Sequence, residues 1–210
     1  MIKRNLFLLM ILFSGTIAVT VISSCEKDEE DNNDITTCEL TREQQQGLLY
    51  MREEEKLARD VYNYLYEKWN VNIFKNIAKS EQHHMDLLLD EVDLCKFEDP
   101  VLPEAGKFTN SHIQELYDAL TTKGDKSLID ALEVGATIED VDIYDLNNFS
   151  DQTDNKTLLE IYDILTCGSR NHMRAFTGWL ENKEEKYSPQ FISTELYDSI
   201  INGEHENCGQ

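Results

Sequence analysis

The chain has 210 residues, of which 41 are acidic and 19 basic, and its formal net charge is −22. Such an excess of acid excludes nucleic acid and anionic lipid headgroups as electrostatic partners, because phosphate binding requires clustered Lys and Arg. The length allows one domain of ordinary size, and the 40% hydrophobic content argues against wholesale disorder. Only three prolines and nine glycines occur, and this scarcity of breakers favours an all-α fold.

The first element is an apparent export signal. Two bases precede an apolar run at residues 6–21, which is short for a transmembrane span and suits a secretory signal. Residues 22–25, Ile-Ser-Ser-Cys, resemble the lipobox of bacterial lipoproteins. The resemblance implies that residues 1–24 are a lipoprotein signal peptide and that Cys25 is acylated. An uncleaved anchor helix is the alternative, and either interpretation places the rest of the chain outside the cytoplasm.

Residues 25–39 are predicted to be an acidic, flexible tether. Residues 26–30, Glu-Lys-Asp-Glu-Glu, resemble the signal that some Gram-negative bacteria place after a lipidated cysteine to send lipoproteins to the cell surface. This resemblance implies a protein that is lipid-anchored to a bacterial outer membrane and lies on its periplasmic or cell-surface side. The alternative role of the acidic segment is solubility.

The remaining chain is predicted to form four long helices and two short ones. Thr41 and Gln44 fit a capping box at the start of the first helix, and Asp125 and Asp154 are the expected caps of the third and fourth long helices. No credible strand pattern is present. The expected helices cover approximately residues 42–69, 72–95, 111–124, 126–147, 155–186 and 188–202.

The long connection after residue 95 predicts the topology. It would let the second and third long helices run in the same direction, as in a four-helix bundle with a crossover connection that contains a short helix. We therefore expect the bundle to occupy residues 40–187, with a short C-terminal helix and tail at residues 188–210.

Each long helix carries a carboxylate or an imidazole near the middle of its apolar stripe. A bundle helix buries positions spaced alternately three and four residues apart, and a buried carboxylate is costly unless it is paired or coordinates a metal. A multivalent cation would resolve this cost for all of them together. The candidate metal ligands, a set able to hold two non-haem iron or manganese ions, are Glu55, Glu81, His84, Glu139, Asp142 and His172.

Other interpretations of these residues stay open at the level of sequence. Either histidine could be a hydrogen-bonded core residue, and Glu55 or Glu139 could pair with an inward arginine. The arginines close to the stripes are Arg52, Arg59, Arg170 and Arg174. Tyr62, two turns from Glu55, is either a core aromatic or a hydrogen-bond donor and electron source beside the site. Glu54 is ambiguous, because its own stripe is also apolar, whereas solvated positions are expected for Glu53, His83 and Glu133.

Two sequence motifs resemble a known family. Glu55 followed seven residues later by Tyr62 resembles the first-helix motif of rubrerythrin-like proteins, and Glu81-x-x-His84 resembles their second-helix motif. Residues 50–62 and 168–172 together are similar to a bacterial and archaeal ferritin-like family catalogued as a domain of unknown function. The resemblance covers roughly residues 40–185 and implies a ferritin-like four-helix bundle with a di-iron or di-manganese site.

The resemblance has one departure. Rubrerythrin-like proteins carry a second E-x-x-H on the fourth helix, but the residue three before His172 is Ser169. Asp142, three residues after Glu139, matches a position where rubrerythrins carry an additional glutamate, so the resemblance implies that it restores the ligand count.

The resemblance also implies an activity. It suggests an oxidoreductase that acts on peroxide or dioxygen, and because no rubredoxin-like pair of CxxC motifs is present, electrons would come from an external donor. Whether the protein is an enzyme stays open. The alternatives are a non-catalytic module for metal binding, storage or sensing, and a structural surface lipoprotein without metal. Ferritin-like bundles often form homodimers, although no second large apolar face requires one here.

Four cysteines follow the lipidation candidate, and in an oxidising compartment they could form two disulfides. Cys38 precedes the first helix and Cys95 ends the second, and an antiparallel hairpin brings these two points to the same end. We therefore predict a Cys38–Cys95 disulfide. Cys167 is expected to be either a buried free thiol or the partner of Cys208.

Overall fold

The structure is a computed structural model that describes residues 38–209. The predicted signal peptide, Cys25 and nearly all of the predicted tether lie outside these residues. Within the described part of the chain, no helix combines the length and the apolar character needed to cross a bilayer.

The all-α fold is confirmed, because residues 38–209 form six helices and no strand. The first two long helices make one hairpin and the last two long helices make another. The six helices are α1 (Arg42–Trp69), α2 (Asn72–Leu94), α3 (Ser111–Gly124), α4 (Leu128–Asp151), α5 (Lys156–Glu181) and α6 (Thr194–Ile201).

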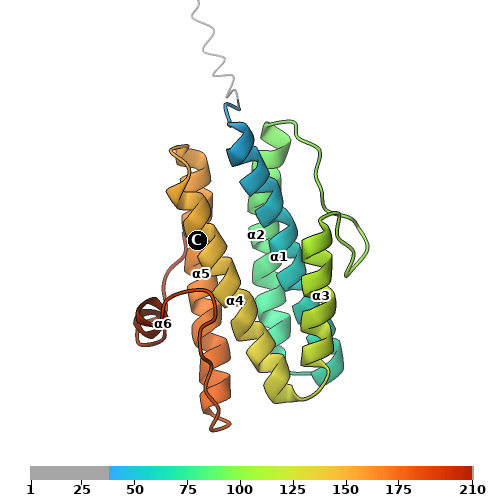
Figure 1. Cartoon of the computed structure of the whole chain (residues 1–210), viewed down its shortest axis with the longest axis vertical. Coiled ribbons are helices and arrows are strands. Elements are labelled where there is room, and N and C mark those ends of the chain that lie inside the picture. The colour runs from blue at the N-terminus through green and yellow to red at the C-terminus, as the bar shows by residue number, and fades with distance from the viewer. Residues whose placement is uncertain (1–37, 210) are drawn as a thin grey trace, which may run out of the picture. The chain divides into compact units, whose positions relative to one another are not determined.

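The two hairpins pack together as a bundle of four long helices (Figure 1). α1 packs against α2 and α4, and α5 packs against α4 and α2. The connection from residue 95 to residue 127 returns along the bundle and carries α3, so α2 and α4 run in the same direction (Figure 1). The predicted crossover topology is therefore confirmed.

Side-chain caps determine where the helices begin. The predicted capping box of α1 is present, with the amide of Gln44 donating to Thr41 Oγ1 at 3.2 Å. The predicted caps of α4 and α5 are wrong by one or two residues, since Ser127 caps α4 and Asn155 caps α5. Asp125 does not serve as the cap of α4, because its carboxylate pairs with Lys68 at 3.1 Å.

The C-terminal helix begins six residues later than predicted, at Thr194. The segment before it is fixed as a loop by the buried carboxylate of Asp140, which accepts the backbone amides of Gln190, Phe191 and Ile192 at 2.5–3.2 Å. In a helix that began at Ser188, the amide of Ile192 would donate to the Ser188 carbonyl, but here it donates to Asp140 instead. α5 likewise ends at Glu181 instead of near residue 186.

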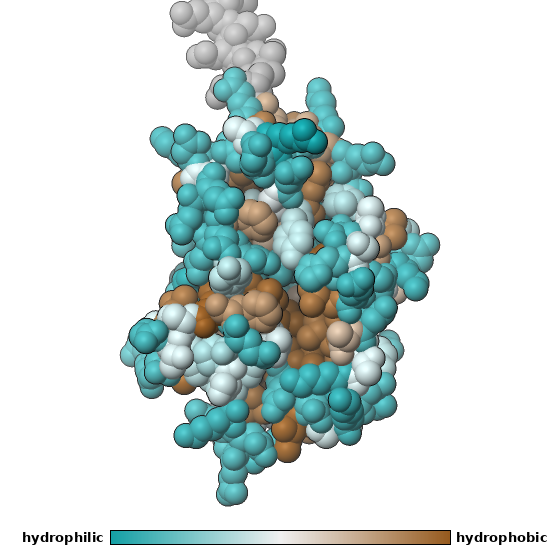
Figure 2. Space-filling view, viewed as in Figure 1, coloured by the Kyte–Doolittle hydropathy of each residue, from teal (hydrophilic) through white to brown (hydrophobic). Residues whose placement is uncertain are grey.

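Apolar side chains form two hydrophobic clusters inside the bundle. One cluster includes Leu48, Met51 and Leu88, and the other includes Ala58 and Ile77. The face shown in Figure 2 is mostly hydrophilic, with smaller apolar areas between the hydrophilic side chains. Along α1, α2 and α5 the candidate metal ligands come between the two clusters, in the middle of the bundle. On α4, Glu139 and Asp142 lie between Ile138 and Ile143 of the second cluster.

The crossover also covers the face of α1 that a plain four-helix bundle would leave exposed. Lys56 is fully buried, and its ammonium donates to Asp60 at 2.5 Å and to two carbonyls of the crossover. The prediction that Glu53 is solvated is wrong. Its carboxylate is buried and accepts the backbone amides of Thr109 and Asn110 just before α3. α1 is consequently buried on nearly every side around the candidate site.

Within residues 38–209, two disulfides join segments that are distant in sequence. Cys38 is bonded to Cys95, the pair expected from the hairpin, and this bond lies at the end of the bundle where α1 begins and α2 ends. Cys167 is bonded to Cys208, which attaches the C-terminal tail to the middle of α5. Of the two possibilities considered for Cys167, the structure has the disulfide.

Candidate metal centre

All four long helices contribute a side chain to one buried polar centre. α1 provides Glu55, α2 provides Glu81 and His84, α4 provides Glu139, and α5 provides His172. None of these residues is more than 8% exposed. The helical stripes thus bring five of the six predicted ligands together between the two hydrophobic clusters.

The five ligands form two sets of three that share Glu81. In the first set, His84 Nδ1 lies 3.1 Å from Glu55 Oε2 and 2.9 Å from Glu81 Oε2. In the second, His172 Nδ1 lies 3.0 Å from Glu81 Oε1 and 3.4 Å from Glu139 Oε2. The ligand atoms of each set all lie within 4.8 Å of one another. One carboxylate therefore presents one oxygen to each of two adjacent ligand sets.

Asp142, the sixth predicted ligand, adjoins the centre but belongs to neither set of three. One of its oxygens accepts a hydrogen bond from the hydroxyl of Ser169, and the other is buried without a hydrogen-bond partner. The serine that replaces the expected glutamate on α5 thus fixes the orientation of a carboxylate on α4.

Tyr62 contacts the centre through its hydroxyl, which donates to Glu139 and also lies 3.3 Å from the carbonyl oxygen of Gly135. The ring is fully buried and packs against Phe176, with ring centroids 5.3 Å apart. Tyr62 is therefore both a core aromatic and a hydrogen-bond partner of a candidate ligand.

Glu54 is an additional buried carboxylate that the sequence left ambiguous. It is 1% exposed, and neither of its oxygens has a hydrogen-bond partner in the described structure. Burial, followed by the negative charges of Asp145 and Glu55, raises the pKa of Glu54 well above its usual value. The apolar stripe around Glu54 was the sequence signal for its burial, because both apolar stripes of α1 face packed neighbours.

Burial dominates the electrostatics of the centre. It raises the pKa of Glu55 to about 7, and together with neighbouring carboxylates it raises the pKa of Asp142 well above its usual value. Burial acts on Glu81 in the same direction, but His172 and His84 outweigh it and lower the pKa of that carboxyl. His172 has its pKa raised to about 10 by Glu81 and Glu139 against the effect of burial. Protons are therefore retained on a cluster that has more acid than base.

The nearby arginines do not neutralise this cluster. Arg52 pairs with Asp99, Arg59 pairs with Asp60, and the two arginines of α5 both pair with Glu206. The alternative in which an inward arginine balances Glu55 or Glu139 is therefore wrong.

The unsatisfied atoms fit a bound cation. Glu55 Oε1, Glu81 Oε1, Asp142 Oδ1 and His172 Nδ1 are buried and form no hydrogen bond within residues 38–209. The Glu81 and His172 atoms lie 3.0 Å apart, yet they are not aligned for a hydrogen bond with each other. Buried polar atoms without partners are rare, and a shared metal ion would satisfy carboxylate and imidazole atoms oriented in this way.

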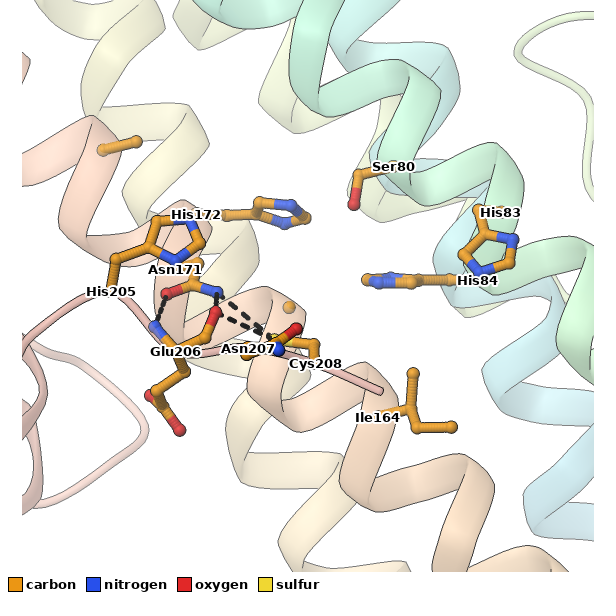
Figure 3. Close-up of a pocket in the computed structure, with 12 residues that line it drawn as sticks. Ser80, His83, His84, Ile164, Asn171, His172, His205, Glu206, Asn207 and Cys208 are labelled. Carbon is orange, nitrogen blue, oxygen red and sulfur yellow. Dashed lines mark hydrogen bonds between the residues drawn. The ribbon is translucent and has the colours of Figure 1, made fainter. Parts of the chain in front are cut away.

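A pocket of about 350 Å³ connects the histidines of the centre with the surface (Figure 3). His84 and His172 line its inner part, and its outer wall includes His205 and Cys208 of the C-terminal tail. His83, predicted to be solvated, is exposed at this pocket. The pocket gives small molecules a route to the imidazole edges.

Comparisons with known proteins identify close relatives. A family model described as "Uncharacterized protein domain (DUF2202)" matches residues 44–204. "Uncharacterized protein MJ0754" of Methanocaldococcus jannaschii is 51% identical over 168 residues, which are 80% of this chain and 91% of that protein. The crystal structure of hypothetical protein MJ0754 from Methanococcus jannaschii aligns with a TM-score of 0.80 and 50% identity, covering 81% of this chain and 98% of that chain.

Proposed function

The chain belongs to the family described as "Uncharacterized protein domain (DUF2202)", and for this member we propose a ferritin-like bundle that holds two iron or manganese ions. One observation carries the proposal: Glu81 is shared between the set with Glu55 and His84 and the set with Glu139 and His172. A shared carboxylate between two groups of oxygen and nitrogen ligands is the arrangement that di-metal carboxylate bundles use.

The donor atoms support the choice of metal. Both sets offer carboxylate oxygens and one imidazole nitrogen, without sulfur, and such a set suits iron or manganese. When bound, these metals would supply one-electron redox chemistry that carboxylates and imidazoles lack. Glu55 and Glu139 would each belong to one ion, Glu81 would serve both, and Asp142 would add charge or a further ligand.

The residues around the ligands hold this arrangement in place. The Tyr62 hydroxyl orients Glu139 and the Ser169 hydroxyl orients Asp142. Such outer contacts fix ligand geometry and tune a metal site. In the proposed activity Tyr62 is also an electron source, because its phenol is fully buried and is hydrogen-bonded to the candidate metal ligand Glu139.

The proposed reaction is the reduction of peroxide or dioxygen. The pocket beside His84 and His172 admits molecules of this size, and the negative charge of the chain does not repel neutral oxidants. A non-catalytic module for metal binding, storage or sensing is the second candidate, and it is favoured by the absence of the α5 carboxylate at Ser169, which leaves the ligand set short of the rubrerythrin pattern.

Metal content and peroxide consumption test the proposal in sequence. The purified full chain is supplemented with iron or manganese and analysed for metal, and about two ions per chain are expected. Less than about half an ion per chain would contradict the di-metal centre. Metal-loaded protein that consumes neither peroxide nor dioxygen in the presence of a reductant would favour the binding module over the enzyme.

We also propose that the protein is exported and anchored by a lipid on Cys25. Two disulfides in residues 38–209 support an oxidising compartment, and the lipobox resemblance supplies the anchor. Cys25→Ser is expected to move the protein from the membrane fraction to the soluble fraction. An unchanged distribution, with no acyl mass on Cys25, would contradict the anchor.

A further inference from the structure

We propose that Cys167 and Cys208 are a redox-active pair that supplies the centre with electrons, and that an exogenous dithiol regenerates their reduced form. The inference rests on the proposed oxidoreductase function, for which the sequence offers no built-in donor such as a rubredoxin-like module. It assigns the donor to this chain and names the chemical class of the external reductant.

The position of the pair is the first observation. Cys208 lines the same pocket as His84 and His172 (Figure 3). Cys167 immediately precedes Gly168, and a Cβ at position 168 would lie 2.5 Å from His84 Nε2. The disulfide therefore adjoins the backbone that touches a candidate ligand. Cys167 is 7% exposed, whereas Cys208 is only partly buried. A reductant can therefore reach the disulfide on its Cys208 side.

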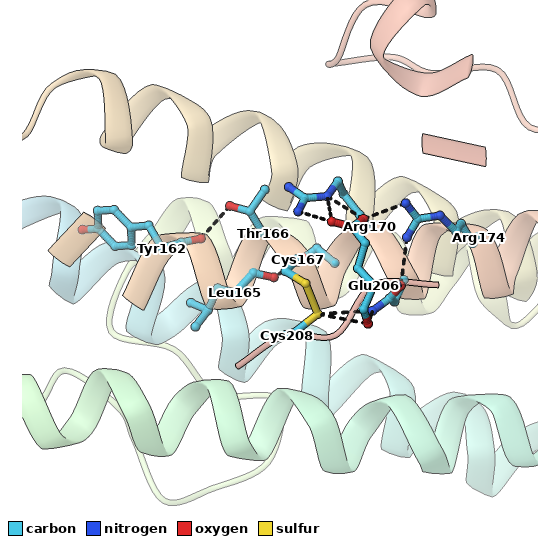
Figure 4. The surroundings of a disulfide bond; sticks show 10 residues. Tyr162, Leu165, Thr166, Cys167, Arg170, Arg174, Glu206 and Cys208 are labelled. Atoms are coloured by element: carbon cyan, nitrogen blue, oxygen red, sulfur yellow. Dashed lines mark hydrogen bonds and ion pairs between the residues drawn. A yellow bond between two sulfur atoms is a disulfide. The ribbon is translucent and has the colours of Figure 1, made fainter. Parts of the chain in front are cut away.

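The tail has attachments to α5 that do not depend on the disulfide (Figure 4). The Glu206 carboxylate accepts hydrogen bonds from Arg170 at 2.5 and 2.9 Å and from Arg174 at 2.6 Å. The backbone carbonyl of Glu206 accepts a hydrogen bond from Asn171 Nδ2 at 3.0 Å, and the backbone amide of Glu206 donates to Asn171 Oδ1 at 2.9 Å. These contacts would keep the two sulfurs close to each other after reduction. The disulfide can therefore form again while the C-terminal tail stays attached to α5.

The polar neighbours of the sulfur atoms differ between the two disulfides. Asn171 Nδ2 donates to Cys208 Sγ at 3.2 Å, and the Glu206 carbonyl oxygen lies farther away at 3.8 Å. A donor to sulfur stabilises a thiolate and therefore the reduced pair. Cys95 Sγ instead lies 3.6 Å from the carboxylate of Glu91, which disfavours a thiolate. The Cys38–Cys95 bond, at the bundle end, is thus the structural disulfide and the matched control.

The proposed chemistry balances as a two-electron reaction. The thiols of Cys167 and Cys208 form one S–S bond and release two electrons and two protons. Hydrogen peroxide accepts them as its O–O bond breaks, giving two water molecules. A thiolate of an exogenous dithiol then attacks the protein disulfide, and its second thiol completes the exchange, which leaves two protein thiols and an oxidised dithiol.

The test follows the disulfides directly. The full chain is reduced, freed of reductant under anaerobic conditions, divided into metal-free and iron- or manganese-loaded samples, and treated with one equivalent of peroxide. Acid quenching, alkylation and mass spectrometry then report each cysteine pair over time. We expect Cys167–Cys208 to form about tenfold or more faster in loaded protein, while formation of Cys38–Cys95 is unaffected by metal.

Variants provide a second measurement. With dithiothreitol as the only reductant, the double variant Cys167→Ser/Cys208→Ser is expected to lose most of its steady-state peroxide consumption. The matched variant Cys38→Ser/Cys95→Ser is expected to retain it at a temperature where both remain folded by circular dichroism. Ascorbate, which bypasses the thiols, is expected to support consumption by both variants.

Failure of the inference differs from failure of the proposed function. If loaded protein consumes peroxide with ascorbate but Cys167–Cys208 forms at the metal-independent rate, the thiol pair is not the donor and the centre is still an oxidoreductase. Equal acceleration of both disulfides by metal would also overturn the inference. If no metal binds, the di-metal centre and the thiol donor are both wrong. If loaded protein consumes no peroxide with any reductant, the oxidoreductase and the thiol donor are wrong, and the metal-binding module is favoured.

Discussion

Gly168 lies against the imidazole of His84 so closely that a Cβ at position 168 would be 2.5 Å from Nε2 and 2.6 Å from Cε1. A glycine on α5 therefore makes room for a candidate ligand on α2. Gly168→Ala is expected to displace His84 from Glu55 and Glu81 and to weaken metal binding by about 10–100-fold. Equilibrium metal titration of the folded variant measures this change.

Gly178→Ala is the matched control for this substitution. Gly178 lies on the same helix, and a Cβ there would have no neighbour within 4 Å. The control is expected to bind metal normally and to gain about 0.5–1 kcal/mol of unfolding free energy, because alanine stabilises a helix more than glycine. Normal metal affinity in Gly168→Ala would show that the position of His84 does not limit binding.

Glu81 is the residue whose removal should affect both ions at once. In the natural protein, metal at about 100 times its dissociation constant is expected to raise the unfolding free energy by about 2.7 kcal/mol. Glu81→Gln removes the charge shared by the two ligand sets, so metal should no longer raise its melting temperature. Glu133→Gln, at a partly exposed carboxylate paired with Lys123, should respond to metal normally.

The result for Glu81→Gln separates the candidate functions. A melting temperature that metal raises equally in the natural protein and in Glu81→Gln would place metal binding elsewhere. A natural protein whose melting temperature does not respond to iron or manganese would favour a structural role without metal.

The Tyr62 hydroxyl should contribute to stability and to turnover in ways that can be separated. Tyr62→Phe leaves buried Glu139 without one hydrogen-bond donor, so we expect a loss of about 1–3 kcal/mol in the unfolding free energy of metal-free protein. Metal stoichiometry should be preserved, while peroxide consumption falls if the phenol supplies electrons. Chemical denaturation and peroxide assays measure the two effects.

Tyr162→Phe is a suitable comparison, because Tyr162 is also buried in the bundle but belongs to the hydrophobic cluster away from the centre. We expect this variant to keep its turnover. Equal peroxide consumption by the natural protein and Tyr62→Phe would assign the tyrosine to packing and to the orientation of Glu139 only.

The sequence predicted that these polar side chains would meet inside the bundle, because each candidate ligand interrupts an apolar stripe on a long helix. Glu81 and His84 are on one face of α2, and His172 is the only ionisable residue on its stripe, so helical geometry alone brings them inward. Which arginine pairs with which acid was not predictable. The partners of Arg170 and Arg174 come from a tail without periodicity, and that tail is positioned by contacts distant in sequence.

The surroundings of α1 show a second limit of sequence reasoning. A stripe argument assumes that one face of a helix meets the core and the opposite face meets solvent. Here the crossover packs on the remaining face of α1, so Glu53 and Lys56 are buried although they lie off the main stripe. An irregular connection leaves no periodic signal, and the burial of these charges depends on where it folds back.

Glu206 should make the attachment of the C-terminal tail sensitive to acid. Hydrogen bonds from Arg170, and then from Arg174, lower the pKa of its carboxyl to about 2. A folded-state pKa below the unfolded value of about 4.3 gives a stabilisation that is complete above the unfolded pKa and is lost as the pH falls through the folded pKa. Because the carboxylate is 31% exposed, we expect its contribution to be about 1–2 kcal/mol after allowance for screening.

The unfolding free energies of the natural protein and Glu206→Gln, measured from pH 7 to pH 2, should differ by a constant amount above about pH 5 and converge toward pH 2. Glu204→Gln, at an exposed position two residues away, should have the same unfolding free energy as the natural protein at every pH. A difference between Glu206→Gln and the natural protein that stays constant down to pH 2 would contradict the assignment of the effect to this carboxylate.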